Sequence, residues 1–274
     1  MYDNICKFLA EHFSLDFARW FVGQAIELTE LSPSELSLEP IRADSLIVLQ
    51  SSALILHLEF QTDADPKIPF RMLDYRVRVY RRFPDKEMRQ VVIYLRPTES
   101  PLVYQNQFNL DKLHHEFEVV RLWEQPTELF LNSPGLLPFA ALSRTDNPLE
   151  VLTQVAQTVE QIEDREEQAN IAAASSILAG LILNQESIQR ILRRDLMRES
   201  SMYQSILDEG LEKGIQQGLQ QGLQQGLQQG IQQGIQQGLE QVAVNLFRNG
   251  TPVEQIINVT GLTRERLEEL TREI

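Results

Sequence analysis

A four-residue repeat near the C-terminus restricts what this chain can form more than any other feature. Glycine occupies every fourth position from 210 to 238, and Leu or Ile follows each glycine. Four residues advance about 400° on an α-helix, so the glycine and Leu/Ile rows shift by roughly 40° per repeat and wind around a straight helix. Each interior glycine costs about 1 kcal/mol relative to alanine, which leaves a lone helix of this sequence marginal in water.

Either the helix is stabilised by a partner helix, or this segment is disordered. Glycine at every fourth position lets two helix backbones approach closely, and the direction of the drift suits a right-handed supercoil. We therefore expect a homo-oligomer assembled through residues 210–241, with a flexible low-complexity linker as the alternative. Residues 242–274 follow as two short helices around a glycine turn. This outline is shared with helix-turn-helix DNA readers, but TRERLEELTRE has no excess of basic residues, and its leucines favour packing.

The N-terminal half mixes two periodicities. Helical spacing predicts an amphipathic helix over Tyr2–Gly23, broken near Ser14, and another over 68–83. Alternating or β-branched runs predict a hairpin of 45–50 with 54–61, and strands at 90–95 and 116–123. This order predicts an α/β (α+β) core of a mixed sheet flanked by helices.

The predicted domains follow from these patterns: a core over 1–143, a helical region over 144–209, the repeat over 210–241, and a small helical hairpin over 242–274.

Charge and composition narrow the function classes. The formal charge of −14 argues against nucleic-acid binding by the whole surface, so any DNA contact requires a local basic patch. The single cysteine, Cys6, cannot form an internal disulfide, and no stretch reaches the length of a membrane span. We expect a protein without membrane contact that resides in the cytoplasm.

Polar residues gather at the ends of the predicted hairpin strands. Asp44 precedes the first strand, while Glu59 and Gln61 close the second and share one of its faces because strand side chains alternate. Two carboxylates converging with a backbone carbonyl, that of Phe60, form the hard-oxygen site that Mg²⁺ favours. By spacing alone, strand-end carboxylates are more often solvated or salt-bridged.

The residues around this hairpin resemble a known family. The pattern resembles the PD-(D/E)XK nuclease superfamily: an aspartate, Asp44, is followed fifteen residues later by Glu59-Phe60-Gln61. The Glu-x-Gln form is that of Rpn-type recombination-promoting nucleases, a family also labelled transposase. The blocks IRADSLIVL, LILHLEFQTDADPKIPFRMLDYR and VVIYLRP resemble this family as well. The resemblance covers roughly residues 1–143.

This resemblance implies Mg²⁺- or Mn²⁺-dependent cleavage of DNA, with Asp44 and Glu59 as metal ligands. Gln61 stands where the superfamily usually has lysine, and glutamine can orient the attacking water but cannot supply charge. Arg71, or alternatively Lys67, is the candidate to provide the missing cation. The basic row of the following helix is expected to grip DNA phosphates: Arg71, Tyr75, Arg78 and Arg82.

Two other hypotheses remain open at this stage. The loss of the lysine is also consistent with a catalytically decayed nuclease fold that serves as an oligomeric interaction scaffold. Transposition would need strand joining as well as cutting, and the sequence gives no sign of a joining function.

Overall fold

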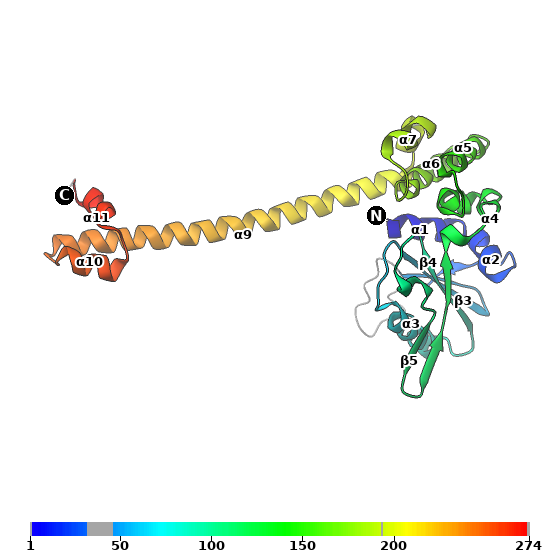
Figure 1. Ribbon diagram of the computed structural model, residues 1–274, viewed down its shortest axis with the longest axis horizontal. Coiled ribbons are helices and arrows are strands. Elements are labelled where there is room, and N and C mark those ends of the chain that lie inside the picture. The colour runs from blue at the N-terminus through cyan, green and yellow to red at the C-terminus, as the bar shows by residue number, and fades with distance from the viewer. Residues whose placement is uncertain (1, 32–45, 193, 273–274) are drawn as a thin grey trace. The chain divides into compact units, whose positions relative to one another are not determined.

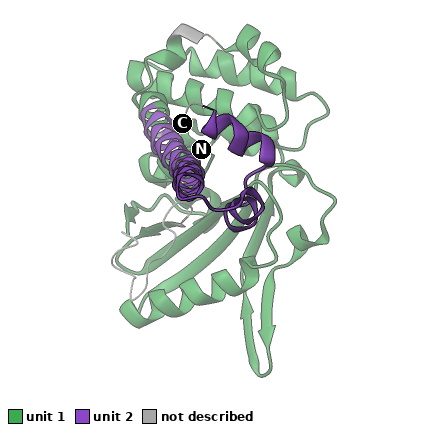
Figure 2. Cartoon of the chain, turned by 90° about the vertical axis from the view of Figure 1, so that its left-hand side faces the viewer, with its two compact units in different colours: residues 1–207 green, residues 208–274 purple. Residues whose placement is uncertain are grey.

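The computed structural model describes residues 2–31, 46–192 and 194–272 of the 274-residue chain. The chain divides into two compact units, residues 1–207 and 208–274 (Figure 2). Residues 144–207 therefore belong to the same compact unit as the predicted core of 1–143. The boundary between the units falls within the long helix α9 (Ser201–Arg248).

Two short helices open the first unit, α1 (Tyr2–His12) and α2 (Ser14–Val22). The break predicted near Ser14 is confirmed, because Phe13 has φ −114° and ψ 41°, outside the helical region. The second helix ends at Gly23, which has the left-handed φ of 76° that glycine adopts without a Cβ penalty.

A mixed five-stranded sheet forms the centre of this unit, in the order β1-β2-β3-β4-β7. Strands β1 (Thr29–Glu30), β2 (Leu46–Gln50) and β3 (Leu54–Gln61) pair antiparallel. Strands β4 (Glu87–Tyr94) and β7 (Glu118–Arg121) continue the sheet in parallel with β3. The mixed sheet and the predicted hairpin are confirmed.

Helices cover both faces of the sheet (Figure 1). The helix α3 (Ile68–Arg82) packs on one face, where Ile55 meets Tyr75 and Val79. The opposite face carries the larger core, in which Leu56, Leu58 and Phe60 pack with residues of many helices. Among them are α1, α2, the 3-10 helix η4 (Pro134–Leu142), α5 (Pro148–Val159) and α6 (Arg165–Ala179).

The strand expected over 116–123 is divided in the structure. Residues up to Glu116 belong to β6 (Leu113–Glu116), which forms a separate hairpin with β5 (Gln107–Leu110), whereas β7 joins the main sheet. The division falls at Phe117, whose side chain is buried and whose N–H donates to the carbonyl of Asn106 over 2.9 Å. Alternation of side chains continues through such a break, so the pattern alone did not reveal it.

Short helical segments complete the first unit. They are η2 (Pro101–Tyr104), η3 (Leu122–Glu124), α4 (Glu128–Leu131), α7 (Gln185–Ile191) and α8 (Arg194–Arg198). The 3-10 helix η4 is held to α2 at Gly135, whose N–H donates to Oδ2 of Asp16 over 3.0 Å. A Cβ at Gly135 would lie 2.2 Å from Cβ of Phe13, so this approach requires glycine.

The glycine repeat lies within α9, a helix of 48 residues that is about 72 Å long at 1.5 Å per residue. A Cβ added at any of its eight glycines would meet nothing within 4 Å. The Leu and Ile side chains from Leu211 to Ile235 are 53–74% exposed. Across the described part of the chain, α9 included, no helix has the length and apolarity needed to cross a membrane.

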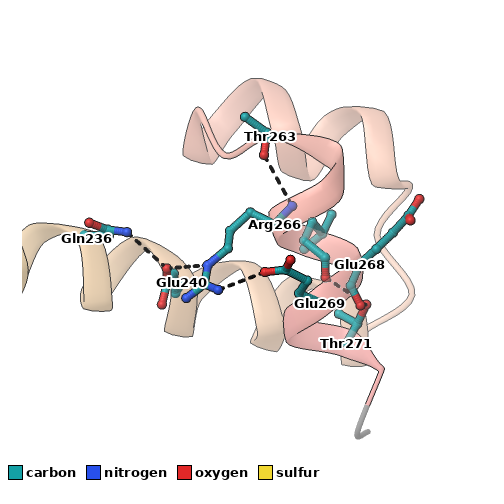
Figure 3. A network of polar contacts seen from close by, with 8 residues as sticks. Gln236, Glu240, Thr263, Arg266, Glu268, Glu269 and Thr271 are labelled. Carbon is teal, nitrogen blue, oxygen red and sulfur yellow. Dashed lines mark hydrogen bonds and ion pairs between the residues drawn. The ribbon is translucent and has the colours of Figure 1, made fainter.

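The end of α9 carries a small helical cap formed by α10 (Val253–Thr260) and α11 (Arg264–Thr271). Ala243, Ile256 and Leu267 bury their side chains against one another, which confirms the predicted pair of short helices and the packing role of Leu267. Figure 3 shows the polar contacts at the same junction: Arg266 donates to Glu240 of α9 over 2.9 Å and to Glu269 over 3.0 Å.

Candidate active site

The last residues of β3 direct polar and apolar side chains to opposite faces of the sheet. Glu59 lies on the face that α3 covers, with its carboxylate near residues of that helix. Phe60 points the other way, where its ring stacks on Phe139 at 5.8 Å between centroids. The alternation predicted from the sequence is thus confirmed, and Phe60 can offer the site only its backbone carbonyl.

Glu59 is completely buried, and two side chains donate hydrogen bonds to its carboxylate. Its Oε1 accepts from Nη1 of Arg71 over 2.8 Å and from Nε2 of Gln61 over 3.1 Å. A buried carboxylate without such partners would be very costly, so these donors are what allows a charge at this position. The structure therefore brings together three of the residues singled out from the sequence: Glu59, Gln61 and Arg71.

Arg71 links two carboxylates. Its Nη2 contacts Oδ2 of Asp65 over 2.8 Å, while Nη1 contacts Glu59. Partial burial lowers the pKa of Arg71, but the hydrogen bond to Glu59 and the charges of Glu59 and Asp65 outweigh it and raise the pKa. The guanidinium stays charged and places a cation beside Glu59. Lys67, the other candidate, lies at the N-cap of α3, where its backbone N–H donates to Asp65.

Asp65 and Tyr94 are site residues that sequence reasoning missed. Asp65 sits in the TDADPK segment between β3 and α3, four residues after Gln61. Tyr94 pairs with Gln61 across β3 and β4, and burial, followed by the charge of Asp65, raises the pKa of its hydroxyl. The acidic segment was a usable signal for Asp65, because a second carboxylate near the strand end suits a cation site.

The donor set for a metal is incomplete within the described residues. Oε2 of Glu59 is buried and has no hydrogen-bond partner, and Nε2 of His57 lies 3.7 Å from it. Nowhere in 2–31, 46–192 or 194–272 do three or more His, Cys, Asp or Glu side chains form a group able to hold a metal ion. Asp44, the other predicted ligand, lies outside the described residues.

The residues of the predicted DNA-contacting row on α3 differ in their exposure. Tyr75 is 6% exposed, and its ring packs edge-on against His57 at 5.0 Å between centroids. Burial, and then the charge of Glu59, raises the pKa of Tyr75 to about 12. Arg78 forms an ion pair with Asp74 over 2.9 Å, and Arg82 is exposed at the end of the helix. The structure therefore leaves Arg78 and Arg82 at the surface and places Tyr75 in the core.

A separate cleft runs along β4 and β7. It has a volume of about 770 Å³ and is lined in part by Leu54, Glu87 and Arg121. Leu54 pairs with Glu87 at the first position of the β3–β4 register, five positions before Glu59. Glu59 does not line this cleft, whereas Gln90, which pairs with His57 across β3 and β4, does.

Comparison with known proteins adds no relative. No family model, no curated protein and no solved structure matches this chain.

Proposed function

We propose that this protein is a metal-dependent DNA endonuclease of the PD-(D/E)XK type, with its active centre at Glu59. The observation that carries the proposal is a fully buried carboxylate at a strand end, with one oxygen held by an arginine and a glutamine and the other unpartnered. Burying a charge is costly, and buried titratable groups cluster at functional sites. The mixed sheet with α3 between two parallel strands supports the fold assignment.

Glu59, the carbonyl of Phe60 and Asp44 would hold Mg²⁺ or Mn²⁺. Asp44 is two residues before Leu46 in the sequence, and Leu46 pairs with Glu59, which supports placing Asp44 in this set. The ion would activate water and neutralise charge on the phosphate. These ligands are oxygens, which suits a hard cation that keeps several of its waters.

Arg71 takes the role for which the superfamily usually uses lysine. Its guanidinium already lies 2.8 Å from Glu59 and carries a permanent charge, so it can stabilise negative charge that develops on a phosphate. Gln61 adjoins the same oxygen and can orient a water molecule through its amide. Arg82, exposed at the end of α3, and Arg78, partly buried and paired with Asp74, are the arginines of α3 that would meet DNA phosphates on a chain of net charge −14.

The test is cleavage of supercoiled plasmid by the full chain with Mg²⁺ or Mn²⁺. Glu59→Gln keeps the size of the side chain and removes the charge, whereas Glu87→Gln makes the same change on the exposed start of β4. We expect nicking and linearisation with the unmodified protein and with Glu87→Gln, and none with Glu59→Gln or after EDTA. Cleavage that survives Glu59→Gln would reject the site.

A second candidate function, assembly through α9, is favoured by a separate observation. All eight repeat glycines have open space at Cβ, and the adjacent Leu/Ile row is exposed. The glycines together cost the helix about 8 kcal/mol relative to alanine, and pairing with the α9 of a second copy would offset that cost by burying the apolar row. This proposal makes the chain an oligomeric scaffold, with or without cleavage.

Light scattering tests the assembly directly. We expect the full chain to have a multiple of the monomer mass, and a variant lacking residues 210–238 to have a smaller multiple. If the deletion leaves the number of chains per particle unchanged, the repeat does not mediate assembly and acts as a linker.

A further inference from the structure

His57 has no part in the proposed chemistry, but it is the buried neighbour of Glu59. It lies two residues earlier on β3 and therefore on the same face of the sheet. Its side chain is 0% exposed, and its Nε2 lies 3.7 Å from Oε2 of Glu59. Both of these atoms are buried and neither has a hydrogen-bond partner. Two unpartnered polar atoms side by side in a core call for an explanation.

Gln90 holds the other nitrogen of the ring. The two residues are paired across β3 and β4, and Nε2 of Gln90 lies 3.0 Å from Nδ1 of His57. The same amide nitrogen donates to the backbone carbonyl of Met72 on α3 over 2.8 Å. A carbonyl only accepts, so the nitrogen end of the Gln90 amide must face Met72. The reversed amide would set two oxygen acceptors against each other.

This contact fixes which ring nitrogen carries the proton. An amide NH₂ group only donates, so Nδ1 of His57 must accept and cannot carry hydrogen. In the uncharged imidazole the proton is then on Nε2, the nitrogen that faces Oε2 of Glu59. The atom without a partner is thus a donor, and the nearest carboxylate oxygen is an acceptor.

We propose that His57 is a positioning residue for Glu59, and that Gln90 makes it one by fixing the Nε2–H tautomer. Arg71 and Gln61 then donate to Oε1 of Glu59, while the N–H of His57 faces Oε2 across 3.7 Å. Because Nε2 bears the proton, His57 is neither a metal ligand nor a proton acceptor through this nitrogen. The effect of His57 on cleavage rests on the proposed nuclease function, whereas the assignment of its tautomer is independent of that function.

The tautomer can be measured without any activity assay. Long-range ¹H–¹⁵N correlation spectra of the ¹⁵N-labelled full chain, at about pH 8, above the usual titration range of imidazole, distinguish the two protonated nitrogens. The chain has four histidines, and the signals of His57 are those missing from His57→Gln. We expect the proton on Nε2. A proton on Nδ1 in the unmodified protein would overturn the proposal.

Variants at Gln90 link the tautomer to function. Gln90→Glu replaces the donor with an acceptor and should move the proton to Nδ1, whereas Gln105→Glu, at an exposed position, should leave it on Nε2. In the plasmid assay we expect Gln90→Glu to lower kcat about 10–100-fold with KM unchanged, the range typical for residues that orient a ligand.

A tautomer that moves without a fall in kcat would overturn the positioning role. If no form of the protein cleaves DNA, the nuclease proposal fails, but the spectra still decide the hydrogen bonding of His57. If Gln90→Glu does not fold, the spectrum of the unmodified protein alone decides the tautomer.

Discussion

Removing the guanidinium from Arg71 should destabilise the first unit, because it leaves the charge of Glu59 buried without its cation. Arg71→Met keeps most of the length of the aliphatic stem and deletes the two contacts of 2.8 Å to Glu59 and Asp65. Breaking a buried ion pair by removing one partner costs about 3–5 kcal/mol. The side chain of Arg71 is 30% exposed and Gln61 still donates to Glu59, so we expect a smaller loss of about 2–3 kcal/mol.

The measurement is urea unfolding followed by tryptophan fluorescence. Both tryptophans, Trp20 and Trp123, belong to the first unit, so the signal does not report on unfolding of the repeat helix. Arg78→Met is the matched control, because Arg78, 21% exposed, forms an ion pair of the same type on the same helix with Asp74, whose side chain is 39% exposed rather than fully buried like Glu59. We expect that control to change the free energy of unfolding by less than about 0.5 kcal/mol.

A double-mutant cycle isolates the pair. Glu59→Gln removes the buried charge and leaves Arg71 bonded to Asp65, so it should change stability by less than about 1 kcal/mol. Added to Arg71→Met, it should recover about 2 kcal/mol, which is the coupling between the two residues. If Arg71→Met costs no more than Arg78→Met, then Arg71 does not sustain the charge of Glu59, and its proposed role at the site falls.

Three further predictions follow from other parts of the chain. The double variant Gly222→Ala with Gly226→Ala should stabilise an unpaired α9 by about 1 kcal/mol for each substitution. If a second helix packs on the glycine row, the same variant should lower the particle mass measured by light scattering. An unchanged mass contradicts that packing. The raised pKa of Tyr75, about 12 when folded, means that its contribution to stability is complete below the unfolded value near 10 and is lost as pH rises through 12. Tyr75→Phe should therefore reduce the fall in unfolding free energy between about pH 10 and pH 12 by up to about 3 kcal/mol, and an identical fall in both proteins refutes this. Gly135→Ala should cost about 1–3 kcal/mol in the same urea assay because its Cβ meets Phe13, and a neutral effect would contradict the close approach.

Local patterns in the sequence predicted most elements of the first unit. The break near Ser14, the hairpin that ends at Glu59, the helix from Ile68 and the buried strand through Val92 were all visible as period or turn signals. Period-two alternation also placed Glu59 and Gln61 on a different face from Phe60. These features depend on neighbours within a few residues, which is the range over which side-chain periodicity acts.

Contacts between distant segments decided the rest. The packing of 144–207 against the core and the position of η4 depend on close approaches such as Gly135 to Phe13, which leave no periodic signal. The burial of Tyr75, the pairing of Arg71 with Glu59, and the contacts of Gln90 with His57 and Met72 likewise arise where α3 packs on the sheet.

By itself, then, the sequence determined the hairpin of β2 with β3, the helix α3, the polar row at the end of β3 and the four-residue repeat, since each is a property of consecutive residues. Only the tertiary structure decided which cation neutralises Glu59 and which nitrogen of His57 faces it. Those outcomes depend on the register of β3 with β4 and on the packing of α3, and both are set by the burial of side chains far apart in the chain.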